Sequence, residues 1–119
     1  MPQESGSVNA LREATVEIRF ARGYQLECVV DTGFDGALIV PASFAKRLGF
    51  PVVARLVFDL VGSARMSADV ALSEIEWLGQ HRTVEVILSV GDDALIGTEM
   101  FEDAKLIVDY ANRLVTISS

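Results

Sequence analysis

Short apolar segments, separated by turn residues, recur along almost the whole chain and restrict it to a fold built from strands. Most of them alternate apolar and polar side chains with the two-residue period of a half-buried strand, and the others are brief, fully apolar runs. The segments lie at residues 14–20, 24–30, 37–40, 52–61, 66–78, 82–90, 94–97, 105–110 and 113–118. Several of the turns between them are short enough for hairpins. The sequence therefore predicts an all-β domain, mostly strand with one or two short helices, of sandwich or barrel type.

Helical signals are confined to two places. Residues 41–49 are predicted to form a helix, because Pro41 suits a first helical turn and Gly49 can end the helix. Residues 98–104 are expected to form one or two helical turns, with Thr98 as the N-cap.

One domain accounts for the chain, because 119 residues are enough to bury a single core and no linker-like segment interrupts them. The first dozen residues are small and polar, so residues 1–13 are expected to form a flexible arm and residues 14–119 the folded domain. Near the end of the chain, Asn112 is expected to adopt the left-handed conformation that a tight hairpin turn requires.

Composition excludes several classes of partner and site. Ten basic and seventeen acidic side chains give a net charge of -7, which disfavours a nucleic-acid partner. Charged residues interrupt every apolar run long enough to be a membrane helix, and no secretory leader is visible, so we expect a cytoplasmic protein without a membrane partner. A single cysteine, Cys28, and a single histidine, His81, argue against a disulfide and a His-based metal cluster, and Asp92-Asp93 lacks further ligands. We therefore expect no metal and no cofactor, which leaves carboxylate chemistry open.

A carboxylate motif stands at the end of the second strand-like segment. Asp31-Thr32-Gly33 follows two valines directly. Such a tripeptide is also an ordinary polar turn, and chance alone places one in a chain of this length roughly a few per cent of the time. A second element, Leu95-Ile96-Gly97, lies far downstream and joins two large aliphatic residues to a glycine.

Together, these two elements resemble the retropepsin-like single-lobe aspartic proteases, bacterial type. In that family a strand ends in two hydrophobic residues and Asp-Thr-Gly, and a later hydrophobic-hydrophobic-glycine packs behind the loop. The resemblance covers the chain from about Thr15 to Ile117, and the final segment, 95–117, is also similar to the end of pepsin-like lobes. It implies a single-lobe acid protease barrel whose active site forms only in a homodimer. The implied substrate is a peptide or protein bound in an extended conformation.

The resemblance also assigns roles to residues. It gives catalysis to Asp31, Thr32 and Gly33, substrate binding to Phe34, Asp35, Gly36, Gly62 and Ser63, and support of the active-site loop to Leu95, Ile96 and Gly97.

Three positions depart from the family pattern. Phe34 stands where most aspartic proteases have Ala or Ser, although bacterial relatives do show Phe. Thr98 stands where retroviral enzymes carry an arginine that pairs with the acid matching Asp35. The expected flap tip, residues 61–65, contains one glycine where retroviral flaps have several.

These observations favour one function and keep two alternatives open. The first is an aspartic endopeptidase that hydrolyses peptide bonds with water activated by the paired Asp31 carboxylates of two subunits. The second is a dimeric peptide-binding module of the same fold that cleaves little or nothing, as the three departures suggest. The third is an unrelated β domain with a chance Asp-Thr-Gly.

Overall fold

The structure is a computed structural model that describes residues 2–59, 62 and 64–119. The strands within these residues are β1 (Gln3–Val8), β2 (Ala14–Phe20), β3 (Gln25–Val30), β4 (Leu38–Pro41), β5 (Val52–Asp59), β6 (Arg65–Trp77), β7 (Gln80–Ser89), β8 (Leu95–Ile96), β9 (Lys105–Asp109) and β10 (Leu114–Ser118). One α-helix, α1 (Ala42–Leu48), and two short 3-10 turns, η1 (Ala21–Gly23) and η2 (Thr98–Phe101), complete the described elements. The fold is mostly β with one short helix, as the segment pattern predicts.

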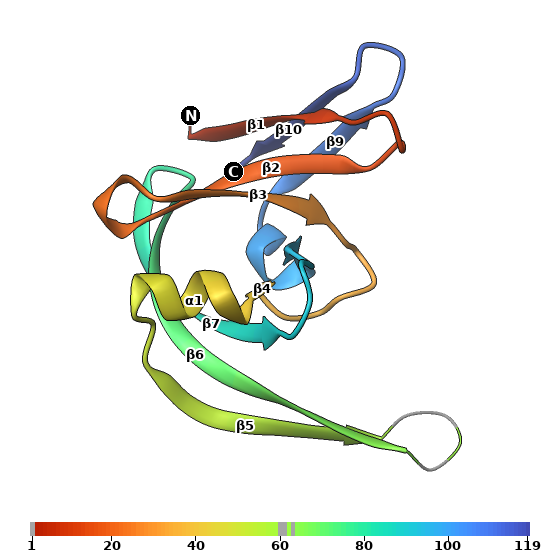
Figure 1. Ribbon diagram of the computed structural model, residues 1–119. Coiled ribbons are helices and arrows are strands. Elements are labelled where there is room, and N and C mark those ends of the chain that lie inside the picture. Colours follow the sequence, from red (N-terminus) through yellow and green to blue (C-terminus); the bar gives the residue numbers. More distant parts are fainter. Residues whose placement is uncertain (1, 60–61, 63) are drawn as a thin grey trace.

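The ten described strands form one mixed sheet in the order β5-β6-β7-β4-β8-β3-β2-β1-β10-β9. A further pairing between β2 and β6, at Arg19 with Glu76 and Phe20 with Ile75, joins strands far apart in this order and closes the middle of the sheet into a ring. The β5–β6 hairpin extends from this ring away from the body of the molecule (Figure 1).

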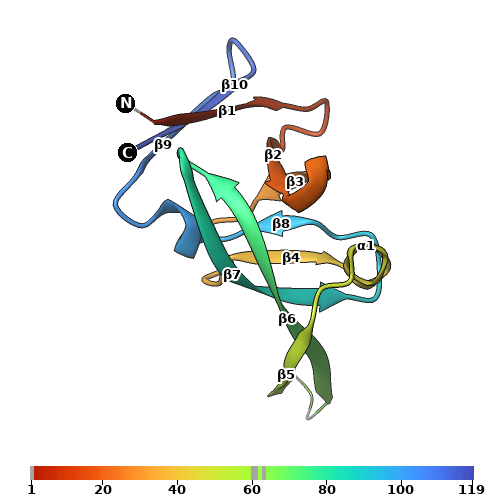
Figure 2. The same ribbon diagram turned by 90° about the vertical axis from the view of Figure 1, so that its left-hand side faces the viewer.

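The centre of the sheet brings together strands that are distant in the sequence. The short strand β8 lies between β3, with which it runs parallel, and β4, with which it runs antiparallel. β4 then pairs in parallel with β7. Figure 2 shows these four strands one below the other. This arrangement places the end of β3 directly beside β8.

The core lies inside the ring and is almost entirely apolar. Its largest fully buried side chains include Trp77, Ile18 and Met100, and the Trp77 indole N–H donates a hydrogen bond of 3.0 Å to the Met100 carbonyl. Cys28 is also fully buried. The indole N–H of Trp77 is therefore hydrogen-bonded although it is buried, and the apolar core packs the surrounding strands together.

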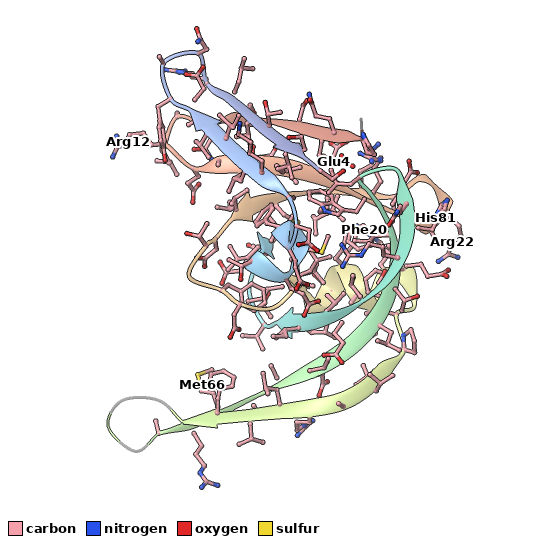
Figure 3. All side chains as sticks on the ribbon, turned by 180° about the vertical axis from the view of Figure 1, so that it is seen from behind. Glu4, Arg12, Phe20, Arg22, Met66 and His81 are labelled. Carbon is pink, nitrogen blue, oxygen red and sulfur yellow. The ribbon has the colours of Figure 1, made fainter. Side chains whose placement is uncertain are left out.

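The N-terminal segment corrects an expectation, because Gln3–Val8 is a strand and not a flexible arm. β1 pairs with both β10 and β2. Glu4 is 5% exposed, accepts two hydrogen bonds of 3.0 Å from the Arg19 guanidinium, and accepts a third of 2.8 Å from the Leu78 backbone N–H. This interaction raises the pKa of Arg19, chiefly through the hydrogen bond with Glu4. Figure 3 shows Glu4 near the β6–β7 turn. Polar composition misled the sequence interpretation because the buried carboxylate of Glu4, paired with Arg19, anchors the segment together with the single buried apolar side chain of Val8.

Two local expectations also differ from the structure. Thr98 does not cap a helix: it is the first residue of η2, Gly97 occupies the N-cap position, and no side chain makes a capping hydrogen bond. In the β9–β10 turn the left-handed residue is Arg113, with φ 56°. Asn112 instead donates backbone and side-chain hydrogen bonds of 3.1 and 2.8 Å to the Asp109 carboxylate, which lowers the pKa of Asp109.

The C-terminal end of α1 follows the sequence pattern, with Gly49 in the left-handed region at φ 74°. Among the described residues, no helix combines the length and apolarity that a membrane crossing demands.

Candidate active site

Asp31 lies directly after β3, at the centre of a tight hydrogen-bonded loop. Its backbone N–H donates to the Ile96 carbonyl at 3.0 Å, and its own carbonyl accepts from the Phe34 N–H at 3.1 Å. One carboxylate oxygen, Oδ1, accepts a hydrogen bond of 2.9 Å from the Gly33 N–H. The side chain is half-buried. The loop thus holds one carboxylate oxygen against the backbone.

The support behind the loop is β8. Val29 and Val30 are paired with Leu95 and Ile96, and the Val29 N–H donates to the Ala94 carbonyl at 2.8 Å. The strand that presents Asp31 is therefore held along its last residues by main-chain hydrogen bonds.

Gly97 touches the loop where a side chain has no room. Its N–H donates to the Ala37 carbonyl at 2.8 Å, and a Cβ at this position would overlap the Gly36 carbonyl oxygen and lie 2.5 Å from the Phe34 ring. The next N–H, that of Thr98, donates to the Phe34 carbonyl at 2.8 Å. A glycine is required here because backbone and ring atoms of the loop fill the space.

The Phe34 ring also restricts the second glycine of the loop. A Cβ on Gly36 would lie 2.6 Å from the tip of the Phe34 ring. Phe34 thus fills the space between Gly36 and Gly97, and its own side chain remains half-exposed. This is the packing role of a residue that the sequence interpretation considered only for substrate binding.

The outer side of the loop faces solvent. Thr32, Gly33 and Asp35 are exposed. Among the described residues, no cation forms an ion pair with Asp35, and the Thr32 hydroxyl has no hydrogen-bond partner. The structure therefore brings Asp31 and Gly33 together with residues 95–97, but among the described residues Thr32 and Asp35 have no side-chain partners.

A cavity of about 410 Å³ lies between the β5–β6 hairpin and the neighbouring body of the sheet, and its lining does not include residues 31–36. The hairpin contributes Leu56, Phe58 and Met66, and the body contributes Ile39 and Leu95 among others. Figure 3 shows Met66 on the side of the hairpin that is turned toward the body. Gly62, at the turn of the hairpin, is exposed with φ 90°, whereas Ser63 and Val61 lie outside the described residues.

Comparison with known proteins identifies the fold. No protein-family model matches the chain. An uncharacterized protein from Archaeoglobus fulgidus is 28% identical over 116 residues, covering 92% of this chain and 89% of the relative. The crystal structure of a retropepsin-like aspartic protease from Rickettsia conorii superimposes with a TM-score of 0.72 over 97% of this chain and 89% of that one, at 16% identity.

Two further structures agree. EIAV protease, complexed with the inhibitor HBY-793, gives a TM-score of 0.61 at 18% identity and covers 83% of this chain and 96% of that one. The retroviral protease-like domain of Ddi1 from Leishmania major gives 0.56 at 16% identity, with coverages of 89% and 92%. This chain has the retropepsin-like aspartic protease fold.

Sequence reasoning missed most of the apolar lining of the cavity in this retropepsin-like fold. Leu56 and Phe58 alternate along β5, and Met66 and Ala68 alternate along β6, opposite them in register. The signal was the two-residue alternation of the predicted hairpin, which puts all four side chains on one face. The alternation predicts that the four side chains share one face of the hairpin, but it does not predict that this face covers a cavity.

Other titratable groups do not extend the site. Burial raises the pKa of the Cys28 thiol to about 12, so this side chain stays protonated and unreactive near neutral pH. Within the described part of the retropepsin-like chain, no three His, Cys, Asp or Glu side chains gather in a way that could hold a metal ion.

Proposed function

We propose that this protein is an aspartic endopeptidase that works as a homodimer and hydrolyses peptide bonds in extended peptide or protein segments. Asp31 of each subunit supplies one carboxyl group of the catalytic pair. Neither metal nor cofactor takes part. The observation that carries the proposal is the Asp31 loop, which holds a half-buried carboxylate beside exposed residues and follows a strand paired with Leu95, a residue that lines the apolar cavity.

Hydrolysis by this route needs two carboxyl groups in different protonation states. Two carboxyl groups that lie close together share one proton, because two adjacent negative charges repel each other. The ionised group removes a proton from water as it attacks the peptide carbonyl carbon, and the protonated group donates a hydrogen bond to the carbonyl oxygen as it becomes tetrahedral. The intermediate then breaks its C–N bond as the amine leaves with the proton that the first carboxyl group took from water, which returns that group to its ionised form. A single Asp31 cannot take both roles. In a twofold dimer, the Asp31 carboxyl group of one subunit can lie beside that of the other.

Substrate binding follows from the cavity and the hairpin. An extended peptide fits between the Asp31 loop and the β5–β6 hairpin, with apolar side chains against Leu56 and Phe58. Gly36 and the hairpin turn at Gly62 and Ser63 are the proposed main-chain contacts. The side chains of Thr32 and Asp35 are exposed and have no partner in the described part of the chain, so that of Thr32 can bond across the dimer and that of Asp35 can meet the substrate.

The test is proteolysis of an unfolded protein at pH 4–6 by the wild type and by Asp31→Asn. The amide cannot act as a base, so the cleavage rate is expected to fall by about 10²–10⁴-fold or more. Asp103→Asn is the matched control, because Asp103 is exposed, lies outside the site, and already has the positive φ that asparagine tolerates. Undiminished cleavage by a correctly folded Asp31→Asn variant would contradict the mechanism.

A second candidate is a dimeric peptide-binding module that keeps the fold and cleaves little. The packing around Phe34 favours it, because this ring occupies the position of a small residue in most aspartic proteases and fills the space against Gly97. Asp35 also lacks an arginine partner among the described residues. Incubation with an apolar peptide library separates the two candidates: the module retains peptides intact, whereas the protease releases fragments.

A further inference from the structure

We propose that a pocket at the base of the β5–β6 hairpin binds a free α-amino acid with an apolar side chain. The pocket has a volume of about 250 Å³ and lies where η1, the C-terminal end of α1 and β6 meet. Figure 1 shows the β2–β3 turn, which contains η1, above the end of α1 on the left of the molecule. The lining shares no residue with the Asp31 loop or with the cavity of about 410 Å³, so the inference does not depend on the proposed function.

The pocket occupies an opening in the ring of strands. β6 pairs with β5 as far as Ala71, and with β2 at Ile75 and the next residue. Among the described strands, the intervening residues 72–74 have only β7 beside them, and they form one wall of the pocket. The Leu72 backbone N–H donates to the Pro51 carbonyl at 3.1 Å and closes the side toward the hairpin. The opening thus lies where β6 changes its partner strand.

Two opposite charges line the pocket from different elements. Arg22 belongs to η1 and Glu74 to β6. Both side chains are exposed, and among the described residues neither forms an ion pair, with each other or with a third group. A zwitterion complements this arrangement, because its carboxylate can pair with the guanidinium and its ammonium with the glutamate.

The Arg22 guanidinium is positioned by the end of α1. Its Nη2 donates a hydrogen bond of 2.9 Å to the Leu48 carbonyl, and its Cζ lies 5.9 Å from the centre of the Tyr24 ring. This is the one hydrogen bond that the guanidinium makes within the described part of the chain, so its other N–H groups remain available. A guanidinium held in this way can bind a carboxylate through two parallel hydrogen bonds.

Ser73 adds a buried hydroxyl group to the wall of the pocket. The buried face of β6 is otherwise apolar from Ala71 to Trp77, and Ser73 is 6% exposed within it. Its Oγ makes one long hydrogen bond of 3.3 Å, to the carbonyl of the next residue, Glu74. The hydroxyl oxygen keeps lone pairs that can accept from a donor. A ligand ammonium can therefore donate to Ser73 as well as to the Glu74 carboxylate.

The rest of the lining accounts for an apolar side chain on the ligand. Its apolar members are Leu48, Phe50, Pro51 and Leu72. The volume of about 250 Å³ is below the roughly 300–1,000 Å³ that is typical of pockets for drug-sized ligands, so it suits a single amino acid. Burial of apolar surface favours leucine or phenylalanine over glycine or alanine.

A second cavity with opposite charges lacks this complementarity. It has a volume of about 400 Å³, and Lys46 and Asp69 are in its lining. The acid there is already paired, because Asp69 lies 3.3 Å from Arg55. A ligand ammonium would have to displace that arginine. The unpaired charges of Arg22 and Glu74 therefore favour the pocket at the hairpin base.

Ligands that lack one charged group test the zwitterion. L-leucine, leucinamide (without the carboxylate) and N-acetylleucine (without the ammonium) are each titrated into the isotope-labelled full chain, and NMR chemical shifts give the dissociation constants. L-leucine is expected to bind about tenfold more tightly than either analogue, because each analogue loses a charge-assisted hydrogen bond. Shift changes are expected at Ser73 and Glu74, and none at Asp31.

Two substitutions then assign each end of the ligand to its residue. Arg22→Gln is expected to abolish the preference for L-leucine over leucinamide, and Glu74→Gln the preference over N-acetylleucine. A loss of folding alone would not remove one preference and leave the other. The matched controls are Arg12→Gln, at an exposed arginine with a similar φ of 64°, and Glu27→Gln, at an exposed position of β3. Both controls are expected to bind L-leucine as the wild type does.

Three results would overturn the inference. The first is the absence of shift changes at the pocket with millimolar L-leucine and L-phenylalanine. The second is a preference for L-leucine over leucinamide that survives in Arg22→Gln. The third is equal binding of L-leucine and N-acetylleucine, which would mean that the pocket takes a carboxylate end, such as a peptide C-terminus, and not a free amino acid. Asp31→Asn is expected to bind L-leucine with wild-type affinity whether or not it cleaves peptides, so the pocket and the proposed function are tested separately.

Discussion

The Asp31 loop and the β5–β6 hairpin are held in opposite ways, and of the two only the hairpin lines the apolar cavity. The loop is closed by backbone hydrogen bonds to Ile96 and Phe34 and leaves no room for a side chain at Gly97. The hairpin carries apolar side chains that remain 42% (Leu56), 39% (Phe58) and 47% (Met66) exposed. The loop is closely packed, whereas the apolar face of the hairpin is open.

This difference indicates a division of labour. A catalytic carboxylate has to stay within a few tenths of an ångström of its productive position, which dense packing provides. Contiguous exposed apolar side chains lower solubility and are usually kept for a binding partner. We therefore expect changes at the loop and body to cost folding stability, and changes at the hairpin to affect substrate binding instead.

We expect the largest proportional difference in folding stability between the body and the hairpin when an ion pair is removed from each. Glu4→Ala removes a buried carboxylate, leaves the Leu78 N–H without its acceptor, and leaves Arg19, which is 36% exposed, with Glu76 alone at 4.0 Å, so we expect a loss of about 2 kcal/mol in the free energy of unfolding. Asp69→Ala removes the exposed hairpin pair with Arg55, at 3.3 Å, and should cost about 0.5 kcal/mol or less. Urea unfolding at two salt concentrations measures both. Equal losses would show that the body is not the more tightly held region.

Three glycines offer a second contrast. Gly97→Ala forces a methyl group against Gly36 and Phe34, and we expect a loss of roughly 2–3 kcal/mol together with lower activity. Gly62→Ala meets no atom within 4 Å but keeps φ 90°, so about 1 kcal/mol is expected. Gly91→Ala meets neither obstacle and serves as the control. Thermal unfolding ranks the three, and a neutral Gly97→Ala would contradict the packing described for the loop.

Replacing one phenylalanine in the loop and one in the hairpin is expected to give the smallest difference in folding stability and the largest difference in substrate binding. Phe34→Ala empties the space between Gly36 and Gly97 and should cost about 2 kcal/mol, below the range for a fully buried ring because Phe34 is half-exposed. Phe58→Ala should cost about 1 kcal/mol or less, since its ring is already 39% exposed, but raise KM with little change in kcat. Denaturation and peptide-cleavage kinetics separate the two effects. The comparison fails if Phe58→Ala unfolds the protein as readily as Phe34→Ala.

Most of the strands could be predicted because each depends on a local pattern. Ala14–Phe20 matches its predicted bounds, and Leu95–Ile96 lies within its predicted run, since alternation and apolar runs report directly on burial in a sheet. β1 was missed because its anchor, Glu4, is buried only by virtue of Arg19 and Leu78, which lie elsewhere in the chain. A buried polar contact leaves no periodic signal.

The sequence by itself determined the strand-rich class and the place of Asp31 at the end of a strand, which depend on residue type and on spacing along the chain. The pairing of the Asp31 motif with residues 95–97 was what the resemblance to aspartic proteases implied. Only the tertiary structure decided that β8 lies between β3 and β4, that Phe34 fills the space against Gly97, and that β9 keeps a free edge. These depend on which distant segments meet, and that is set by packing across the sheet, which no local pattern encodes.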